Sequence, residues 1–156
     1  MSYGYRNLTS LLTTKPGPMN IAITAAAGTD NSEVTSATID RYSFTQGRGQ
    51  SAVFVMQVTA TMASGETAAV SCKFEDSADS SSWAAFGAAM STTTIVSSAG
   101  GAVTAKSGTV QYGINLSSAR RYIRVKLTTN LSASGTDTAL SCGVVVVGGQ
   151  SQLPAA

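Results

Sequence analysis

Polar and apolar residues alternate with a period of two over most of the chain from Val34 onward. The clearest run is 51–62, where one side carries Phe54, Met56, Val58 and Met62 and the other carries Val53, Val55, Gln57 and Thr59. Such alternation predicts a β-strand that buries one side. The same pattern predicts further strands over the ranges 37–44, 67–74, 92–96, 102–105, 109–116, 121–129 and 138–147.

Glycine-containing turn signals separate these segments, and no segment shows a convincing helical period. Short strands divided by turns are typical of a sandwich or barrel. A chain of 156 residues is long enough for one buried core and too short for two ordinary domains. We therefore predict an all-β fold, a single antiparallel β-sandwich of the jelly-roll type over residues 34–156.

The first 33 residues differ and are predicted to form an extended N-terminal arm. This segment contains Pro16 and Pro18, two of the three prolines, and the stretch 19–24 alternates like a short edge strand. Two interpretations remain open, an arm that docks on a neighbouring subunit and an unattached terminus. Under the first, the candidate interface residues are Tyr3, Tyr5, Arg6, Leu8, Leu11 and Leu12.

Composition excludes several classes of protein. Hydrophobic residues make up 43% of the chain and charged residues only 12%, about half the usual share. A net charge of +2 is too weak to predict a nucleic-acid partner. No stretch approaches the ~20 apolar residues of a membrane span, and no secretory signal opens the sequence, so we expect no membrane partner and maturation in a cytosol.

The sequence predicts no enzyme, metal or cofactor. Histidine is absent, which removes the commonest general base and metal ligand. Three of the eight carboxylates, Glu75, Asp76 and Asp79, precede a run of serines. They allow a Ca²⁺ loop or a glycosidase pair, but the glycine turn of a calcium loop is missing. Solvated loop charge is the preferred interpretation.

The densest charge is the run from Arg120 to Lys126. On a strand, Tyr122, Arg124 and Lys126 share one face, opposite the apolar residues between them. This face is a candidate interface for an acidic partner or phosphate, and the alternative is the solvent side of a central strand. Trp83, the single tryptophan, is predicted to fill the core.

Residues 64–72 align without a gap on residues 134–142, and each segment ends in a cysteine. The correspondence predicts two similar hairpins, from a duplication or from two solutions to one packing problem. Cys72 and Cys142 then occupy equivalent strand positions among apolar residues, where we expect unpaired core thiols.

Two pieces of the chain resemble bacteriophage capsid cement (decoration) proteins, small β-sandwich proteins that bind outside an icosahedral head. The pieces are Phe74-Glu-Asp-Ser-Ala-Asp-Ser-Ser-Ser-Trp83 and the run from Ala119-Arg-Arg-Tyr-Ile-Arg-Val-Lys126 to the stretch 144–155. In that family a strand ending in a Ser/Asp loop is followed by a strand like Ala-Arg-Tyr-Ile-Arg-Val. The doubled arginine at Arg120 and Arg121 departs from this pattern.

The resemblance implies a structural virion protein, made in the host cytoplasm, that stabilises the head from outside. Its partners would be the major capsid protein and copies of itself, as a dimer or trimer. The first rival is a carbohydrate- or receptor-binding module of a phage fibre, which needs exposed aromatic residues beside a shallow groove. An enzyme, a tail-tube subunit and a major head subunit are further rivals that the sequence disfavours.

Overall fold

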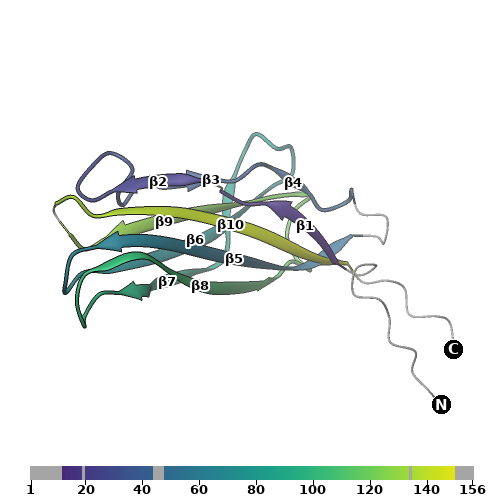
Figure 1. Ribbon diagram of the computed structural model, residues 1–156. Helices are drawn as coiled ribbons and strands as arrows, with labels where there is room; N and C mark the ends of the chain where they lie inside the picture. Colours follow the sequence, from purple (N-terminus) through teal and green to yellow (C-terminus); the bar gives the residue numbers. More distant parts are fainter. Residues whose placement is uncertain (1–11, 19, 44–47, 134, 150–156) are drawn as a thin grey trace, which may run out of the picture.

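A computed structural model describes residues 12–18, 20–43, 48–133 and 135–149. Within these ranges, ten strands form two antiparallel sheets packed as a sandwich, without any helix (Figure 1). The predicted all-β antiparallel sandwich is confirmed.

Each sheet contains five strands. Sheet A has the order β1-β10-β5-β8, with β2 also on β10, and comprises β1 (Leu12–Pro16), β2 (Ile21–Thr24), β5 (Gly49–Met62), β8 (Val103–Asn115) and β10 (Thr138–Gly149). Sheet B has the order β3-β9-β6-β7, with β4 also on β9, and comprises β3 (Glu33–Thr35), β4 (Ile39–Asp40), β6 (Thr67–Ser77), β7 (Ala84–Ser97) and β9 (Tyr122–Leu131).

The chain crosses repeatedly between the sheets. It visits sheet A with β1 and β2, sheet B with β3 and β4, and then changes sheet after β4, β5, β7, β8 and β9. This path places the last two strands, β9 and β10, inside the two sheets, which is the strand order of a jelly roll. Strand β8 is an edge strand of sheet A and β7 is an edge strand of sheet B, and the two run beside one another (Figure 1). The Tyr112 hydroxyl of β8 donates to the Ala88 carbonyl of β7 at 2.5 Å.

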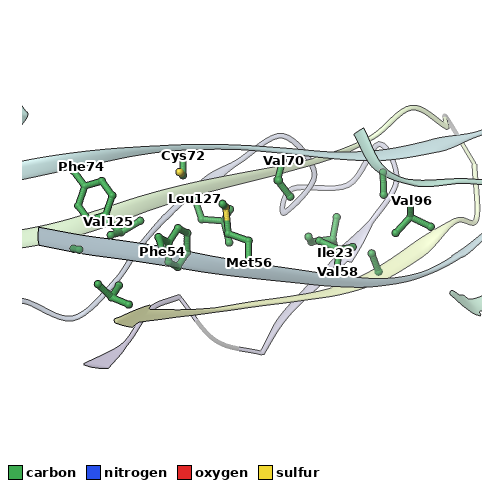
Figure 2. Close-up of a cluster of buried hydrophobic side chains, with 14 of the residues drawn as sticks. Ile23, Phe54, Met56, Val58, Val70, Cys72, Phe74, Val96, Val125 and Leu127 are labelled. Carbon is green, nitrogen blue, oxygen red and sulfur yellow. The ribbon is translucent and has the colours of Figure 1, made fainter. Parts of the chain in front are cut away.

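The core lies between the inner faces of the sheets (Figure 2). Every second residue of β5, β6 and β9 is fully buried there, as the alternation predicts. The labelled cluster shows Phe54, Met56 and Val58 of β5 facing Val70 and Phe74 of β6.

The two predicted hairpins are wrong, because β5 and β6 belong to different sheets, as do β9 and β10. Their actual neighbours are distant in sequence: Thr61 pairs with Thr138, and Ala68 pairs with Leu131. Other strand predictions change length, and the described part of the range 37–44 contains only the two-residue strand β4. The ranges 102–105 and 109–116 form the one strand β8, and β7 begins well before the predicted range 92–96.

Part of the predicted N-terminal arm lies in sheet A. Strands β1 and β2 follow one another along β10, joined across Gly17. The Gly17 N–H donates to the Gly143 carbonyl at 3.0 Å, and the Gly143 N–H donates to the Pro18 carbonyl at 2.7 Å. A Cβ on Gly17 would lie 2.7 Å from a ring carbon of Phe54, so glycine is required by close packing. Residues 1–11 lie outside the described residues.

A buried arginine organises one end of the sandwich. The Arg41 side chain is fully buried, and its guanidinium donates to backbone carbonyls. The acceptors are Gly49 (3.0 and 2.8 Å), Arg120 (2.9 Å), Leu116 and Ala119. Because burial disfavours the charged form, it lowers the pKa of Arg41. One side chain thereby joins the start of β5 to the loop before β9.

Candidate interaction surface

The predicted charged face exists on the outside of sheet B. Tyr122, Arg124 and Lys126 alternate along β9 with Ile123, Val125 and Leu127, which are completely buried. The three outward side chains are half-buried. Their predicted role as an interface stays a prediction.

The cations of this face are paired with carboxylates of neighbouring strands. Lys126 lies 2.7 Å from Glu33 and 3.4 Å from Glu75, and Arg124 lies 2.6 Å from Glu75. Lys73 completes the network at 2.7 Å from Glu33. Hydrogen bonds from Lys126 and Lys73 hold the pKa of Glu33 below its usual value, and Glu33 raises the pKa of Lys126. The outer face of sheet B is therefore a mutually compensated ion-pair network.

Aromatic side chains lie against the arginines at one end of this network. The Arg124 guanidinium carbon lies 4.2 Å from the centre of the Trp83 ring, and that of Arg121 lies 5.0 Å from the Tyr122 ring. Arg121 also pairs with Asp40 at 2.8 Å. The prediction that Trp83 fills the core is wrong: its side chain is half-buried and lies against the outward guanidinium of Arg124.

A hollow of about 200 Å³ opens beside the ion pairs. Its lining is mixed, with charged, hydroxyl and apolar groups from Glu33, Ser71, Lys73, Lys126, Thr128 and Met90, among others. The hollow is thus continuous with the outer face of sheet B.

The clustered carboxylates of the serine-rich loop do not converge. Glu75 points to Arg124, while Asp76 accepts a hydrogen bond from the backbone N–H of Arg120 at 2.8 Å. Asp79 accepts from the backbone N–H groups of Ser82 and Ser81 at 2.8 and 2.9 Å, which lowers its pKa. Among the described residues, no three His, Cys, Asp or Glu side chains gather as a metal site.

The two cysteines are free, but they occupy different environments. Cys72 faces the core, and burial raises the pKa of its thiol to about 12. Cys142 is half-buried on the outer face of sheet A, so its prediction as a core thiol is wrong. The aligned segments present opposite faces to the core: Val70 and Cys72 are buried, whereas their counterparts Leu140 and Cys142 lie on the outer face of sheet A.

The outer face of sheet A was not found from the sequence. Within the part of the chain that the structure describes, the only charged residues of its five strands are Lys15 and Lys106. Lys15 pairs with Val145 and Lys106 pairs with Ala60, and both of these partners are buried. The two lysines therefore occupy inner-face positions on the edge strands β1 and β8. The outward positions carry no charge. They are Leu12, Thr14, Pro16, Ala22 and Thr24 on β1 and β2, Thr138, Leu140, Cys142, Val144, Val146 and Gly148 on β10, Ser51, Val53, Val55, Gln57, Thr59 and Thr61 on β5, and Ser107, Thr109, Gln111, Gly113 and Asn115 on β8.

We call this surface the uncharged face. Large hydrophobic side chains are exposed on it: Leu12, Leu140 and Val144 are 43%, 49% and 36% exposed. They are three of the four large hydrophobic residues that are exposed in the described ranges, the fourth being Tyr42. The signal in the sequence was the lack of charge at alternate positions of three strands. It could be read only once β8, β5 and β10 were known to be neighbours.

A search of the described residues for a helix long and apolar enough to cross a membrane found none. No protein-family model and no curated protein matches the sequence.

Several solved structures are similar to the chain. The PBSX exported protein XepA has 12% identity and a TM-score of 0.47, over 92% of this chain and 40% of that one. Infectious bursal disease virus, Gx strain, has 14% identity and a TM-score of 0.46, over 92% of this chain and 32% of that one. A CBM4 structure has 16% identity and a TM-score of 0.40, over 88% of this chain and 78% of that one. The chain spans less than half of the first two proteins, and likeness at this level carries no inference about function.

Proposed function

We propose that this chain is a non-catalytic assembly protein, and specifically a capsid cement protein that binds the outside of a phage head. The observation that carries the proposal is the uncharged face of sheet A. The outer face of an exposed sheet normally carries charged side chains, as sheet B does here. A sheet face with exposed leucine and valine and no charge is suited to burial against protein, because no ion has to be desolvated.

The head as the binding site is suggested by the resemblance of the Phe74–Trp83 segment and the Ala119–Lys126 segment to cement proteins. A protein that binds the assembled shell and not its dispersed subunits stabilises the shell by mass action. Several weak contacts in a small oligomer add to tight attachment. The major capsid protein is the proposed partner, and the exterior of the virion is the proposed location.

The N-terminal residues are proposed to contact the lattice. Leu12, which follows these residues in the chain, opens β1 at the edge of sheet A and at the border of the uncharged face. Tyr3, Tyr5 and Arg6 are of the types that most often anchor protein interfaces. A truncation that tests this role removes residues 2–11 and leaves Leu12–Pro16 to pair with β10.

The experiment uses purified heads that lack this protein. The full-length chain should bind them and raise the temperature at which they release DNA. The truncated chain should keep its β-type circular dichroism but occupy fewer sites. The charged variant Gln57→Glu/Gln111→Glu should also bind fewer sites, whereas Asn130→Asp on the outer face of sheet B should bind normally. Failure of the full-length chain to bind heads would refute the proposal.

The alternative is a carbohydrate-binding module, favoured by the hollow beside Lys126 and by Trp83 and Tyr122 on the same side of the molecule. It requires that soluble glycans bind the chain and that Trp83→Ala abolishes binding. Retention on a glycan array by the full-length chain, lost in Trp83→Ala and unchanged in Gln57→Glu/Gln111→Glu, would favour this function over attachment to a head.

A further inference from the structure

We propose that the uncharged face of sheet A packs against the same face of a second copy of this chain, forming a symmetric dimer. The inference rests on the proposed function, since it assigns a partner to the surface on which that function depends. It leaves residues 1–11 for the contact with the head.

Charge complementarity selects the partner. A surface without charged groups offers no counter-ion, so a partner that buries it must also be uncharged over the same area, or its own charges lose their solvation. The outer face of sheet B fails this requirement, because it carries Glu33, Lys73, Glu75, Arg124 and Lys126. A second uncharged face meets it. In a twofold dimer each copy uses the same patch, so one neutral surface suffices.

The size of the face matches what a stable dimer needs. Because β1 and β2 lie end to end along β10, sheet A is four strands wide, and β10 contains 12 residues. With strands ~4.8 Å apart and a rise of ~3.3 Å per residue, the face covers about 750 Å². Standard stable interfaces bury about 800 Å² on each partner.

The chemistry of the face supports sheet-on-sheet packing. Leu140, Val144 and Leu12 form an exposed apolar area on the β10 side, and the β8 side carries small hydroxyl and amide groups such as Thr109 and Gln111. Sheets that pack face to face interdigitate β-branched and small side chains about 10 Å apart. Hydroxyl and amide groups form hydrogen bonds across such an interface without any net charge.

The variant Gln57→Glu/Gln111→Glu tests the proposal, because each change is isosteric and adds charge to exposed positions on the face. Analytical ultracentrifugation should show a dimer of the wild-type chain and at least about tenfold weaker association of the variant, since the added carboxylates would be buried without a counter-ion. Asn130→Asp, the matched change on sheet B, should remain dimeric. Circular dichroism and thermal melting establish that each variant is folded.

Cys142 provides an independent measurement, because it lies on the face beside Gln57. Its reaction with N-ethylmaleimide should slow as protein concentration rises through the dimerisation range. Cys72 contributes little signal because burial raises its pKa to about 12, and Cys142→Ser identifies the reacting thiol.

Three outcomes would overturn the dimer: a monomeric wild-type chain at high micromolar concentration, a trimer, or a dimer that keeps its affinity in the charged variant with Cys142 unprotected. The head-binding assay is separate. Heads that bind a monomeric wild-type chain would refute the dimer and support the cement function. A wild-type chain that dimerises but never binds heads would support the dimer and refute the cement function.

Discussion

Arg41 carries a structural role that residue type and local sequence do not reveal. Its neighbours in the chain are a polar loop, yet its guanidinium is completely buried and satisfies the carbonyls of Gly49, Leu116, Ala119 and Arg120. Among the residues that the structure describes, no carboxylate accepts a hydrogen bond from it. A buried charge is tolerated here because five hydrogen bonds replace the lost water.

Replacing Arg41 by methionine should therefore destabilise the whole sandwich. The change leaves several buried carbonyls without donors, and hydrogen bonds to charged groups are worth ~1.5–3 kcal/mol each, so we expect a loss of about 3 kcal/mol or more in the free energy of unfolding. Urea denaturation followed by tryptophan fluorescence measures it. Arg121→Met is the control, because that side chain is exposed and its removal should change stability little. Equal losses in both variants would contradict the role assigned to Arg41.

At the scale of elements, the contact between β5 and the β1–β10 edge depends on two glycines. Gly143 on β10 and Gly17 between β1 and β2 both lie against the ring of Phe54. A Cβ added at Gly143 or at Gly17 would lie only 2.2 or 2.7 Å from a carbon of that ring. Phe54 is completely buried in the core. The close approach explains why a strand otherwise rich in valine contains glycine at its centre.

Gly143→Ala should cost about 1–3 kcal/mol of stability by overpacking. Adding Phe54→Leu should recover part of this loss, since the smaller side chain makes space for the methyl group. The double-mutant cycle is measured by chemical denaturation. Gly113→Ala is the matched control on β8, where the nearest atom to a new Cβ is a Val53 methyl carbon at 3.9 Å. Additive effects of the two core changes would argue against a direct contact.

At the scale of the molecule, the charges are divided between the two sheets. Sheet B carries the ion pairs that join β3, β6 and β9, while the described outward positions of sheet A carry no charged side chain. The same chain thus presents one face that is stable in water and one suited to contact with protein. The net charge of +2 does not reveal that these ion pairs lie on one sheet and not on the outer face of the other.

Stability should depend on pH through the sheet B network. The pKa of Glu33 is lowered from 4.5 in the folded protein, so its contribution is complete above that value and is lost as pH falls through the folded pKa. The pKa of Lys126 is raised from 10.5, so its contribution is complete below that value and is lost as pH rises further. In Glu33→Gln, the free energy of unfolding should therefore fall less steeply toward acid pH, as measured by urea denaturation between about pH 3 and pH 7. An unchanged dependence of stability on acid pH would mean that the ion pairs of Glu33 do not stabilise the fold.

The sequence by itself determined most of the strands and the buried side of three of them. Alternation is a local property with a period of two, so the buried side of β5, β6 and β9 and the outward placement of Tyr122, Arg124 and Lys126 followed directly from it. The sandwich class followed from many short strands and absent helical periods. Pieces of the uncharged face were visible too, as Val53, Val55, Gln57 and Thr59 on one side of one strand.

Only the tertiary structure decided which strands share a sheet. Pairings such as Leu12 with Gly148 join residues far apart in the chain, and local alternation carries no information about them. That is why two predicted hairpins proved to be crossings between sheets, and why Cys142 and Trp83 lie outside the core. It is also why the uncharged face emerged only when β1, β2, β10, β5 and β8 were assembled: a surface of this kind is a property of neighbouring strands, and non-local pairing chooses the neighbours.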